Sequence, residues 1–213
     1  MIDLREIFLS IQGESTYSGL PCIFIRLAGC NLRCSYCDTV YSYEKSLSLD
    51  SAGILQKISK YEPVKLVEIT GGEPLLQNQV YSLIASLYTK GYRILLETNG
   101  SLSLEKTPGY VKKIVDVKCP GSSEQNSFLL SNLQYLKRDD ELKFVLTDYD
   151  DYCFAKEFIK THQITNIPVH FSPVTTTLSP ERLAEWILKD RLAVRLHLQI
   201  HKLIWGSKEE GVF

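Results

Sequence analysis

The sequence predicts an α/β fold in which parallel strands and crossover helices form a partial, open TIM-like barrel. Short apolar runs alternate along the chain with longer amphipathic patterns, which is typical of covered parallel strands joined by helices. Polar and glycine-rich motifs directly follow several of the apolar runs. The chain has 213 residues, whereas a complete eight-fold barrel takes about 250, so we expect the barrel to be incomplete.

Seven segments have the apolar, β-rich character of buried strands. They span residues 22–27, 66–70, 94–98, 114–118, 142–147, 169–173 and 194–200. Because helical patterns separate most of these segments, we expect neighbouring strands to be parallel and their crossovers to be right-handed.

Four amphipathic patterns predict helices between the strands. The first begins after a cap at Ser48 or Asp50, and the second stops near Gly91. The fourth opens at Ser179, with Pro180 at the first helical position. The apolar stripes of the first three consist of Ile54, Leu55, Ile58 and Tyr61, then Val80, Leu83, Ile84 and Leu87, then Phe154, Phe158 and Ile159.

Composition indicates one globular domain over residues 1–213, since 44% of residues are apolar and 23% are charged. The net charge of −1 and the absence of a run of like charges argue against direct nucleic-acid binding. Apolar stretches such as residues 20–28 are too short to span a membrane. The N-terminal segment has no apolar signal core, so we expect a cytoplasmic protein with no membrane partner.

Three cysteines, Cys30, Cys34 and Cys37, lie within eight residues of one predicted loop. Thiolates are the usual ligands of a [4Fe–4S] cluster, and three of them leave one of the four irons open to a small molecule. S-adenosylmethionine (SAM) can chelate such an iron through its amino and carboxylate groups. A structural zinc site is disfavoured because it usually needs two CxxC-like pairs, and this loop has one. Disulfides are disfavoured because clustered cysteines in a cytoplasmic chain more often bind metal.

The motif Gly71-Gly72-Glu73-Pro74 directly follows an apolar strand and has two readings. Paired glycines let backbone carbonyls approach a ligand closely, here the amino group of SAM. The alternative is a plain strand-to-helix turn, and the motif alone does not decide between the two. Beside the cysteine triplet, the ligand-binding reading is favoured.

Four polar loops follow the predicted strands at residues 29–31, 71–74, 99–100 and 118–122. The carboxyl ends of barrel strands share one rim, and barrel enzymes carry their active sites there. We therefore expect these loops to converge.

At this point the sequence resembles the radical SAM superfamily and, more narrowly, the 7-carboxy-7-deazaguanine synthase family. The resemblance runs nearly end to end. It includes IQGE at 11–14, FIRLAGCNLRC at 24–34, YCDT at 36–39, GGEP at 71–74, ETNG at 97–100, DVKCPGS at 116–122, QIHK at 199–202 and IWG at 204–206.

The resemblance implies a ring contraction in queuosine and deazapurine biosynthesis. The substrate would be 6-carboxy-5,6,7,8-tetrahydropterin, and the products would be 7-carboxy-7-deazaguanine and ammonia. The 5′-deoxyadenosyl radical from SAM would remove hydrogen from C6 to give 5′-deoxyadenosine, which would later return a hydrogen atom to the rearranged radical, so that SAM is regenerated. The family also implies magnesium, a homodimer and an electron donor such as flavodoxin or ferredoxin.

The resemblance also assigns residues to the pterin substrate. Arg26 can fork onto the carboxylate with two parallel hydrogen bonds. Glu14 can accept hydrogen bonds from the amino-pyrimidine edge, and Gln12 can add another. His201 contacts the substrate or moves a proton, so Glu14, Arg26 and His201 form the expected catalytic group. The terminal carboxylate of Phe213 is expected to fold over the pocket as part of a tail from about residue 199 to 213.

The resemblance assigns two further groups of residues to cofactors. Thr39 offers a hard oxygen to magnesium, and Asp38 offers a carboxylate through water, a sparse set that suits this ion. The residues expected to contact SAM are Gly71, Gly72, Glu73, Glu97, Asn99, Lys118 and Ser122.

Several assignments keep a structural alternative open. Arg26 can pair with a structural carboxylate, and Glu14 can be a surface residue. Asp38 can simply brace the cluster loop, and His201 can be a satisfied structural histidine. Ser15 stands where the family often has a second glycine, which can shift the substrate loop.

The C-terminus departs from the family pattern as well, since Phe213 extends past an expected Gly-Val ending. Two other functions also remain open. One is an activase that installs a glycyl radical on a large protein, and the other is a non-catalytic iron–sulfur or zinc protein.

Overall fold

The computed structural model describes residues 1–206, and one nine-stranded sheet forms its centre. The strands are β1 Ile2–Ile11, β2 Pro21–Leu27, β3 Leu47–Leu49, β4 Leu66–Gly71, β5 Arg93–Thr98, β6 Lys112–Asp116, β7 Glu141–Leu146, β8 Val169–Pro173 and β9 Arg195–Leu196. The α-helices are α1 Ser51–Ile58, α2 Val80–Thr89, α3 Tyr149–Thr161, α4 Pro180–Asp190 and α5 Ile200–Trp205.

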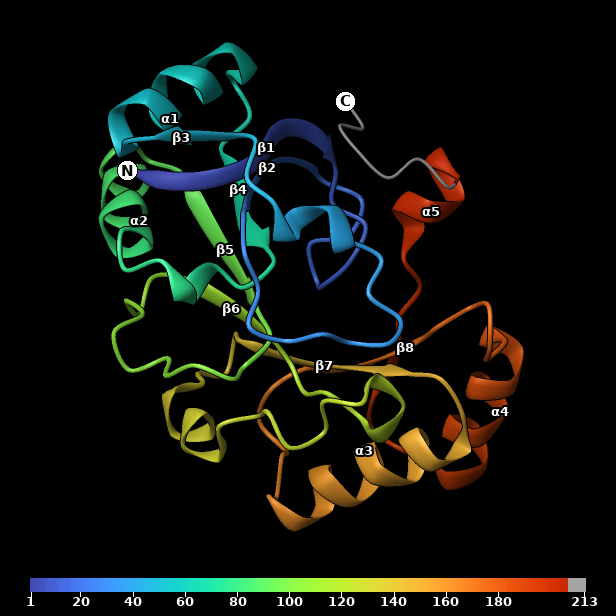
Figure 1. The fold of residues 1–213 in the computed structure, drawn as a ribbon. Helices are drawn as coiled ribbons and strands as arrows, with labels where there is room; N and C mark the ends of the chain where they lie inside the picture. Colours follow the sequence, from blue (N-terminus) through green and yellow to red (C-terminus); the bar gives the residue numbers. More distant parts are fainter. Residues whose placement is uncertain (207–213) are drawn as a thin grey trace.

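The sheet order β3-β1-β2-β4-β5-β6-β7-β8-β9 does not close into a ring. Every neighbouring pair from β2 to β9 is parallel, whereas β1 pairs antiparallel with both β2 and β3. Helices α1 and α2 lie near the half of the curved sheet that contains β1 to β5, and α3 and α4 lie near the half that contains β7 to β9. Helix α5 is set apart from them (Figure 1). The open, partial barrel predicted from the sequence is therefore confirmed.

Strands β1 and β3 were not among the expected segments. Strand β1 carries Asp3, Arg5 and Glu6 among its apolar residues, and its burial is intermediate over most of its length. Charges in a half-buried strand interrupt the apolar run by which a covered parallel strand is recognised. Together these two strands extend the sheet beyond β2 by antiparallel pairing.

The last expected strand, residues 194–200, is wrong over most of its length. Strand β9 is an edge strand of two residues, and the amide of His197 still donates to the carbonyl of Phe171 at 2.8 Å. The chain then leaves the sheet, and the amide of Ile200 donates to the carbonyl of Gly13 at 3.1 Å. An edge strand has a partner on one side only, so a contact across the barrel can replace the end of its ladder.

The four predicted helices are present, with the local signals that predicted them. Asp50, rather than Ser48, caps α1 by accepting from the amide of Gly53 at 2.7 Å. Ser179 caps α4 by accepting from the amide of Arg182 at 3.2 Å. None of the helices in residues 1–206 is both long and apolar enough to cross a membrane.

Alternation along the strands separates two layers of side chains. Outward-facing residues such as Val67, Ile69, Ile94 and Leu96 join the main core, which also contains the buried stripes of α1 and α2. The inner face has a small apolar floor made of Cys22, Phe24, Leu66, Leu95 and Ile114, with Phe8 and Tyr17 packed against it. One or two steps further along the strands, the inner face becomes polar. Its residues there are Arg26, Glu68, Thr70, Glu97, Asp116 and Lys143.

Candidate active site

The three clustered cysteines lie in the loop that follows β2. All three are free and of intermediate burial, and the amide of Cys37 donates to the carbonyl of Cys34 at 3.2 Å. The loop is pinned to the rim beside it, because Ser35 donates its amide to the carbonyl of Ser122 at 3.0 Å and its hydroxyl to the carbonyl of Gly121 at 2.6 Å.

The donor set fits an iron–sulfur cluster better than a single ion. Burial raises the pKa of the Cys30 and Cys34 thiols, whereas the nearby Lys118 ammonium acts to lower it. Within residues 1–206, no group of three or more His, Cys, Asp or Glu side chains is already assembled around one ion position. A cluster places its thiolate ligands on different irons, so they do not need to converge on one point. The other three cysteines lie outside this loop and form no disulfide.

Gly71 and Gly72 are required by the close approach of the loops after β2 and β4. A Cβ on Gly71, whose φ is +140°, would lie 2.2 Å from the carbonyl oxygen of Leu27. A Cβ on Gly72 would lie 2.0 Å from the carbonyl oxygen of Gly29 and 2.9 Å from the Cβ of Cys30. These contacts give the glycines a structural reason, so their contact with SAM stays a prediction.

Glu73 is fully buried and acts as a brace between two rim loops. Its carboxylate accepts from the amide of Leu75 at 3.0 Å, the hydroxyl of Thr98 at 2.9 Å and the amide of Asn99 at 2.8 Å. The protein itself thus occupies both carboxylate oxygens. Direct binding of SAM by Glu73 stays a prediction, and the observed role is to hold Asn99 beside the cysteine loop.

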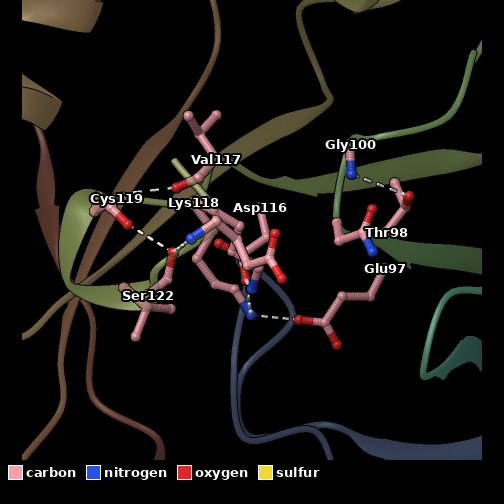
Figure 2. Close-up of polar contacts among 12 residues, drawn as sticks. Glu97, Thr98, Gly100, Asp116, Val117, Lys118, Cys119 and Ser122 are labelled. Atoms are coloured by element: carbon pink, nitrogen blue, oxygen red, sulfur yellow. Dashed lines mark hydrogen bonds and ion pairs between the residues drawn. The ribbon is translucent and has the colours of Figure 1, made fainter. Parts of the chain in front are cut away.

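The remaining residues expected at SAM meet at the same rim. The side-chain nitrogen of Asn99, Nδ2, lies 3.9 Å from Cys30 Sγ and donates to Asn31 Oδ1 at 3.2 Å. Lys118 Nζ pairs with Asp116 Oδ2 at 2.7 Å. Figure 2 shows the Lys118 and Asp116 side chains together with Glu97, which reaches toward the same space from the neighbouring strand β5. The convergence of the rim loops is therefore observed.

Ser122 lies at this rim as well but is turned into the protein. It is fully buried, and its hydroxyl donates to the carbonyl of Cys119 at 2.6 Å (Figure 2). The same hydroxyl accepts from the amide of Glu124 at 3.0 Å. Its position supports the cysteine loop through its own carbonyl, and contact with SAM stays a prediction.

Gln12, Gly13 and Glu14 follow β1 and turn into the barrel. Gln12 is buried, and its amide donates to Glu68 while its carbonyl oxygen accepts from the amide of Glu14 at 2.9 Å. Glu14 accepts from Lys143 Nζ at 3.0 Å and from Gln199 Nε2 at 2.6 Å. Burial acts to raise the pKa of Glu14, but the Lys143 and His201 charges more than offset it and hold that pKa well below its usual range.

His201, on α5, lies directly against Gly13. A Cβ on Gly13 would come within 2.0 Å of His201 Nδ1 and 2.7 Å of its Cγ. Burial lowers the pKa of His201, whereas the Glu14 carboxylate acts to raise it. The sequence-based grouping of Gln12, Glu14 and His201 is thus brought together by the contact between the loop after β1 and α5.

We expect Gly13→Ala to push the His201 ring away and to weaken substrate binding by about tenfold, the equivalent of one lost hydrogen bond. The measurement is the Kd of the substrate for the reconstituted enzyme, compared with that of His201→Ala. If Gly13→Ala binds like the wild-type protein while His201→Ala does not, the packing contact does not position the imidazole.

Arg26, at the carboxyl end of β2, forms a cross-strand pair with Glu6 on β1. Its Nε donates to Glu6 Oε1 at 2.8 Å, and the Tyr41 hydroxyl donates to the same oxygen at 3.1 Å. The structural alternative is therefore partly true. However, the pair uses Nε, so both terminal nitrogens of the guanidinium lack a hydrogen-bond partner within residues 1–206 and can still form a fork.

Asp38 and Thr39 lie side by side after the last cysteine of the loop. The Thr39 hydroxyl donates to Asp38 Oδ1 at 2.8 Å, and Lys202 Nζ pairs with Asp38 Oδ2 at 2.8 Å. Lys202 belongs to α5, so this pair ties the cysteine loop to the segment that carries His201. The observed role of Asp38 includes this bracing, and its contact with magnesium stays a prediction.

Ser15 takes a left-handed conformation, with φ of +62°, which glycine adopts more readily than serine. The serine accepts this conformation because its amide donates to His197 Nε2 at 3.0 Å and its hydroxyl accepts from the amide of Tyr17 at 3.1 Å. Burial lowers the pKa of His197 to about 4, so the imidazole is neutral and can accept this bond. Thr16 adds hydrogen bonds to the buried Glu141.

Four site residues were missed by the sequence analysis, namely Thr70, Glu68, Asp116 and Lys143. The Thr70 hydroxyl donates to Glu97 Oε2 at 3.0 Å, and Lys143 bridges Glu14 and Glu97. For Glu68 and Thr70 the sequence did contain a signal, the alternation of side chains along a strand, which places residues 66, 68 and 70 on one face of β4. The prediction for Phe213 concerns residues 207–213, which lie outside the described part of the chain.

Comparison with known proteins gives the chain its family. The Radical SAM superfamily model matches residues 24–121. A 7-carboxy-7-deazaguanine synthase from Koribacter versatilis is 44% identical over 99% of this chain and 100% of its own length. One from Chlorobaculum tepidum is 39% identical over 99% of this chain and 97% of its own length.

Solved structures agree with this result. QueE from Escherichia coli matches with a TM-score of 0.76 and 26% identity over 93% of each chain. SuiB from Streptococcus suis bound to S-adenosylmethionine shares the fold, with a TM-score of 0.54 and 13% identity over 79% of this chain and 48% of its own. The chain belongs to the 7-carboxy-7-deazaguanine synthase family of the radical SAM superfamily.

Proposed function

We propose that this protein converts 6-carboxy-5,6,7,8-tetrahydropterin to 7-carboxy-7-deazaguanine and ammonia. The observation that carries the proposal is that the interior side of the sheet presents a half-buried Glu14 carboxylate held by Lys143 and Gln199, and an Arg26 guanidinium that uses its Nε for Glu6. The substrate has a guanidine-like edge that donates hydrogen bonds and a carboxylate that accepts them. These two side chains are complementary to its two ends.

The family to which the chain belongs uses a [4Fe–4S] cluster and SAM as cofactors. When bound, they supply a 5′-deoxyadenosyl radical, and the protein supplies position and shelter. Cys30, Cys34 and Cys37 would hold the cluster. Asn99 would support Cys30 through its amide nitrogen, and Glu97 would face the adenosyl half.

Each side chain then has a defined task. Glu14 accepts from the amino-pyrimidine edge, and Arg26 holds the carboxylate, which places C6 between them. His201, kept beside Gly13, contacts the substrate from α5. Lys143 and Gln199 hold the Glu14 carboxylate, and the Lys143 ammonium lowers its pKa, which favours the ionised form that orients the substrate by accepting hydrogen bonds.

Magnesium is proposed to bind the Thr39 hydroxyl, with Asp38 acting through water because Lys202 already occupies one of its oxygens. We expect Thr39→Ala to raise the magnesium concentration needed for half-maximal activity by several-fold, about the cost of one ligand bond. Thr39→Ser is the matched control, since it keeps the hydroxyl and should respond like wild type. An unchanged magnesium response in Thr39→Ala would remove Thr39 from the site.

The physiological setting is proposed from the family resemblance. A flavodoxin or ferredoxin would deliver the electron, the protein would work as a homodimer, and the cytoplasm would provide the reducing conditions that free thiols require.

The deciding experiment is anaerobic incubation of the reconstituted protein with the carboxypterin, SAM, magnesium and dithionite, with products identified by mass. We expect a product with the mass of 7-carboxy-7-deazaguanine and no net consumption of SAM. A glycyl-radical activase would instead need a protein partner and leave the pterin unchanged. A non-catalytic iron–sulfur protein would give no 5′-deoxyadenosine under any of these conditions.

A further inference from the structure

Lys143 is a buried cation on which the acidic groups of the barrel interior converge. Its side chain is 8% exposed, and its Nζ lies 3.0 Å from Glu14 Oε2 and 3.9 Å from Asp116 Oδ2. It also donates to Glu97 Oε1. Strand β7 places it opposite Asp116 on β6, so the two side chains lie on the same inner face.

The interior holds more acidic than basic groups among its described residues. Four carboxyl groups, those of Glu14, Glu68, Glu97 and Asp116, lie around the ammonium groups of Lys143 and Lys118, while the third cation of the inner face, Arg26, pairs with Glu6. Glu14 and Glu68 have different partners, although the Gln12 side chain bonds to both residues. It donates to the Glu68 carboxylate and accepts from the backbone amide of Glu14. Glu14 contacts Lys143 directly, whereas Glu68 accepts from the neutral amide of Gln12.

We propose that Lys143 is a positioning residue for the substrate, whose ammonium group keeps Glu14 ionised and aimed at the amino-pyrimidine edge while it holds Glu97 nearby. The inference rests on the proposed function, because it concerns the substrate contact of Glu14. Its consequence is that Lys143 sets substrate affinity without touching the substrate. Glu68, which accepts from the neutral amide of Gln12, can be compared with Glu14, which accepts from the Lys143 ammonium. Burial and the neighbouring Glu97 and Glu14 charges raise the pKa of Glu68 well above the usual range.

The arrangement differs from that of a merely structural ion pair. Lys113, on the opposite face of the sheet, is 1% exposed and forms an ion pair with a single carboxylate, that of Asp140, at 2.7 Å. Lys143 instead contacts three acidic residues from three segments. One of them, Asp116, is 7% exposed and keeps its Oδ1 without a hydrogen-bond partner within residues 1–206. A buried acceptor left open in this way is available to a ligand or a water molecule in the same interior.

The test is the Kd of the carboxypterin for the reconstituted enzyme loaded with SAM and magnesium, without reductant, from pH 6 to pH 8.5. The readout is the ratio of the Kd of Lys143→Met to that of wild type at each pH, since this ratio cancels the titration of the ligand itself. Several titratable groups face Glu14. They are Lys143 on β7, Glu68 on β4, His201 on α5, His197 after β9 and Asp38 in the cysteine loop.

Removing Lys143 takes away the largest influence that lowers the pKa of Glu14, so burial, opposed by His201 and Gln199 alone, should raise that pKa. We expect the ratio to be largest at pH 6 and to fall by about tenfold per pH unit until Glu14 ionises. Protonation of either imidazole at low pH would add positive charge beside Glu14 and stabilise its ionised form. This effect of the histidines on Glu14 therefore opposes a ratio that grows as the pH falls.

Two control variants make the outcome specific. Lys143→Arg keeps the charge, so its ratio should be raised but constant with pH. Lys113→Met removes a buried lysine far from the pocket, so it should lower the Tm and leave the Kd unchanged. If Lys143→Met does not fold, the double variant Lys143→Met/Glu97→Gln removes both partners of the ion pair and is milder. The same dependence on pH is expected for it.

A ratio that does not change with pH in Lys143→Met, or in the double variant used in its place, overturns the inference. A pH-dependent ratio in Lys143→Arg overturns it as well. These results leave the proposed function intact as long as the wild-type protein binds and converts the carboxypterin. If wild type binds the carboxypterin at no pH, the proposed function fails and the inference falls with it.

Discussion

Cys34→Ala is expected to yield folded protein that cannot hold an intact [4Fe–4S] cluster and cannot cleave SAM. The loop after β2 carries three cysteines, and a cluster with three protein ligands has no spare thiolate to replace a missing one. Loss of a side chain that only supports a metal ligand typically costs 10–100-fold in metal affinity or activity, so loss of a direct ligand should exceed about 100-fold.

The measurements for Cys34→Ala are iron and sulfide content after anaerobic reconstitution, and 5′-deoxyadenosine formed after reduction. Cys153→Ala is the matched control, because Cys153 is also a free cysteine of intermediate burial but packs against the core on α3. It should keep the full iron content and activity. Cluster content and turnover that survive in Cys34→Ala would show that this thiol is not a ligand.

Arg26→Lys is expected to weaken substrate binding by about 10–100-fold while SAM cleavage in the absence of substrate continues. Arg26 uses Nε for Glu6, which leaves the two terminal nitrogens to form a fork on the carboxylate. Lysine has a single ammonium group and cannot do both. A charged hydrogen bond contributes about 1.5–3 kcal/mol, which corresponds to this range of affinity.

The readouts for Arg26→Lys are the substrate Kd and the rate of uncoupled 5′-deoxyadenosine formation. Glu6→Gln serves as the comparison, since it removes the charge that holds Arg26 but leaves the guanidinium in place. We expect it to weaken binding less than Arg26→Lys does. If Arg26 serves the pair with Glu6 alone, Arg26→Lys will lower the Tm and leave the substrate Kd unchanged.

Local signals predicted much of the fold because they act over short stretches of chain. The caps at Asp50 and Ser179 are set by side chains within three residues of the amides they bind. Apolar runs likewise marked the parallel strands from β2 to β8, since strands covered on both faces need apolar residues at successive positions. Strand β1 was not predicted because charged residues interrupt its apolar run. These charges find their partners across the sheet, as Glu6 does with Arg26.

Some features of the site could be predicted from the sequence and others could not. The cysteine spacing and the glycine motif could be recognised because each motif lies within one loop. The contacts of Glu14 could not, since its partners Lys143 and Gln199 lie 129 and 185 residues away along the chain. Buried charges acquire partners through the packing of distant strands, and no local pattern records which lysine faces which carboxylate.

The sequence by itself determined the barrel class and the cysteine loop, because short-range periodicity and spacing carry that information, and the family resemblance added the residues expected at a pterin site. Only the tertiary structure decided that Glu73 and Ser122 are turned into the protein, that Gly13 makes room for His201, and that Lys143 joins three carboxylates. The physical reason is that a buried charge must be satisfied wherever the fold places it. Its partner is therefore chosen by proximity in space rather than along the chain.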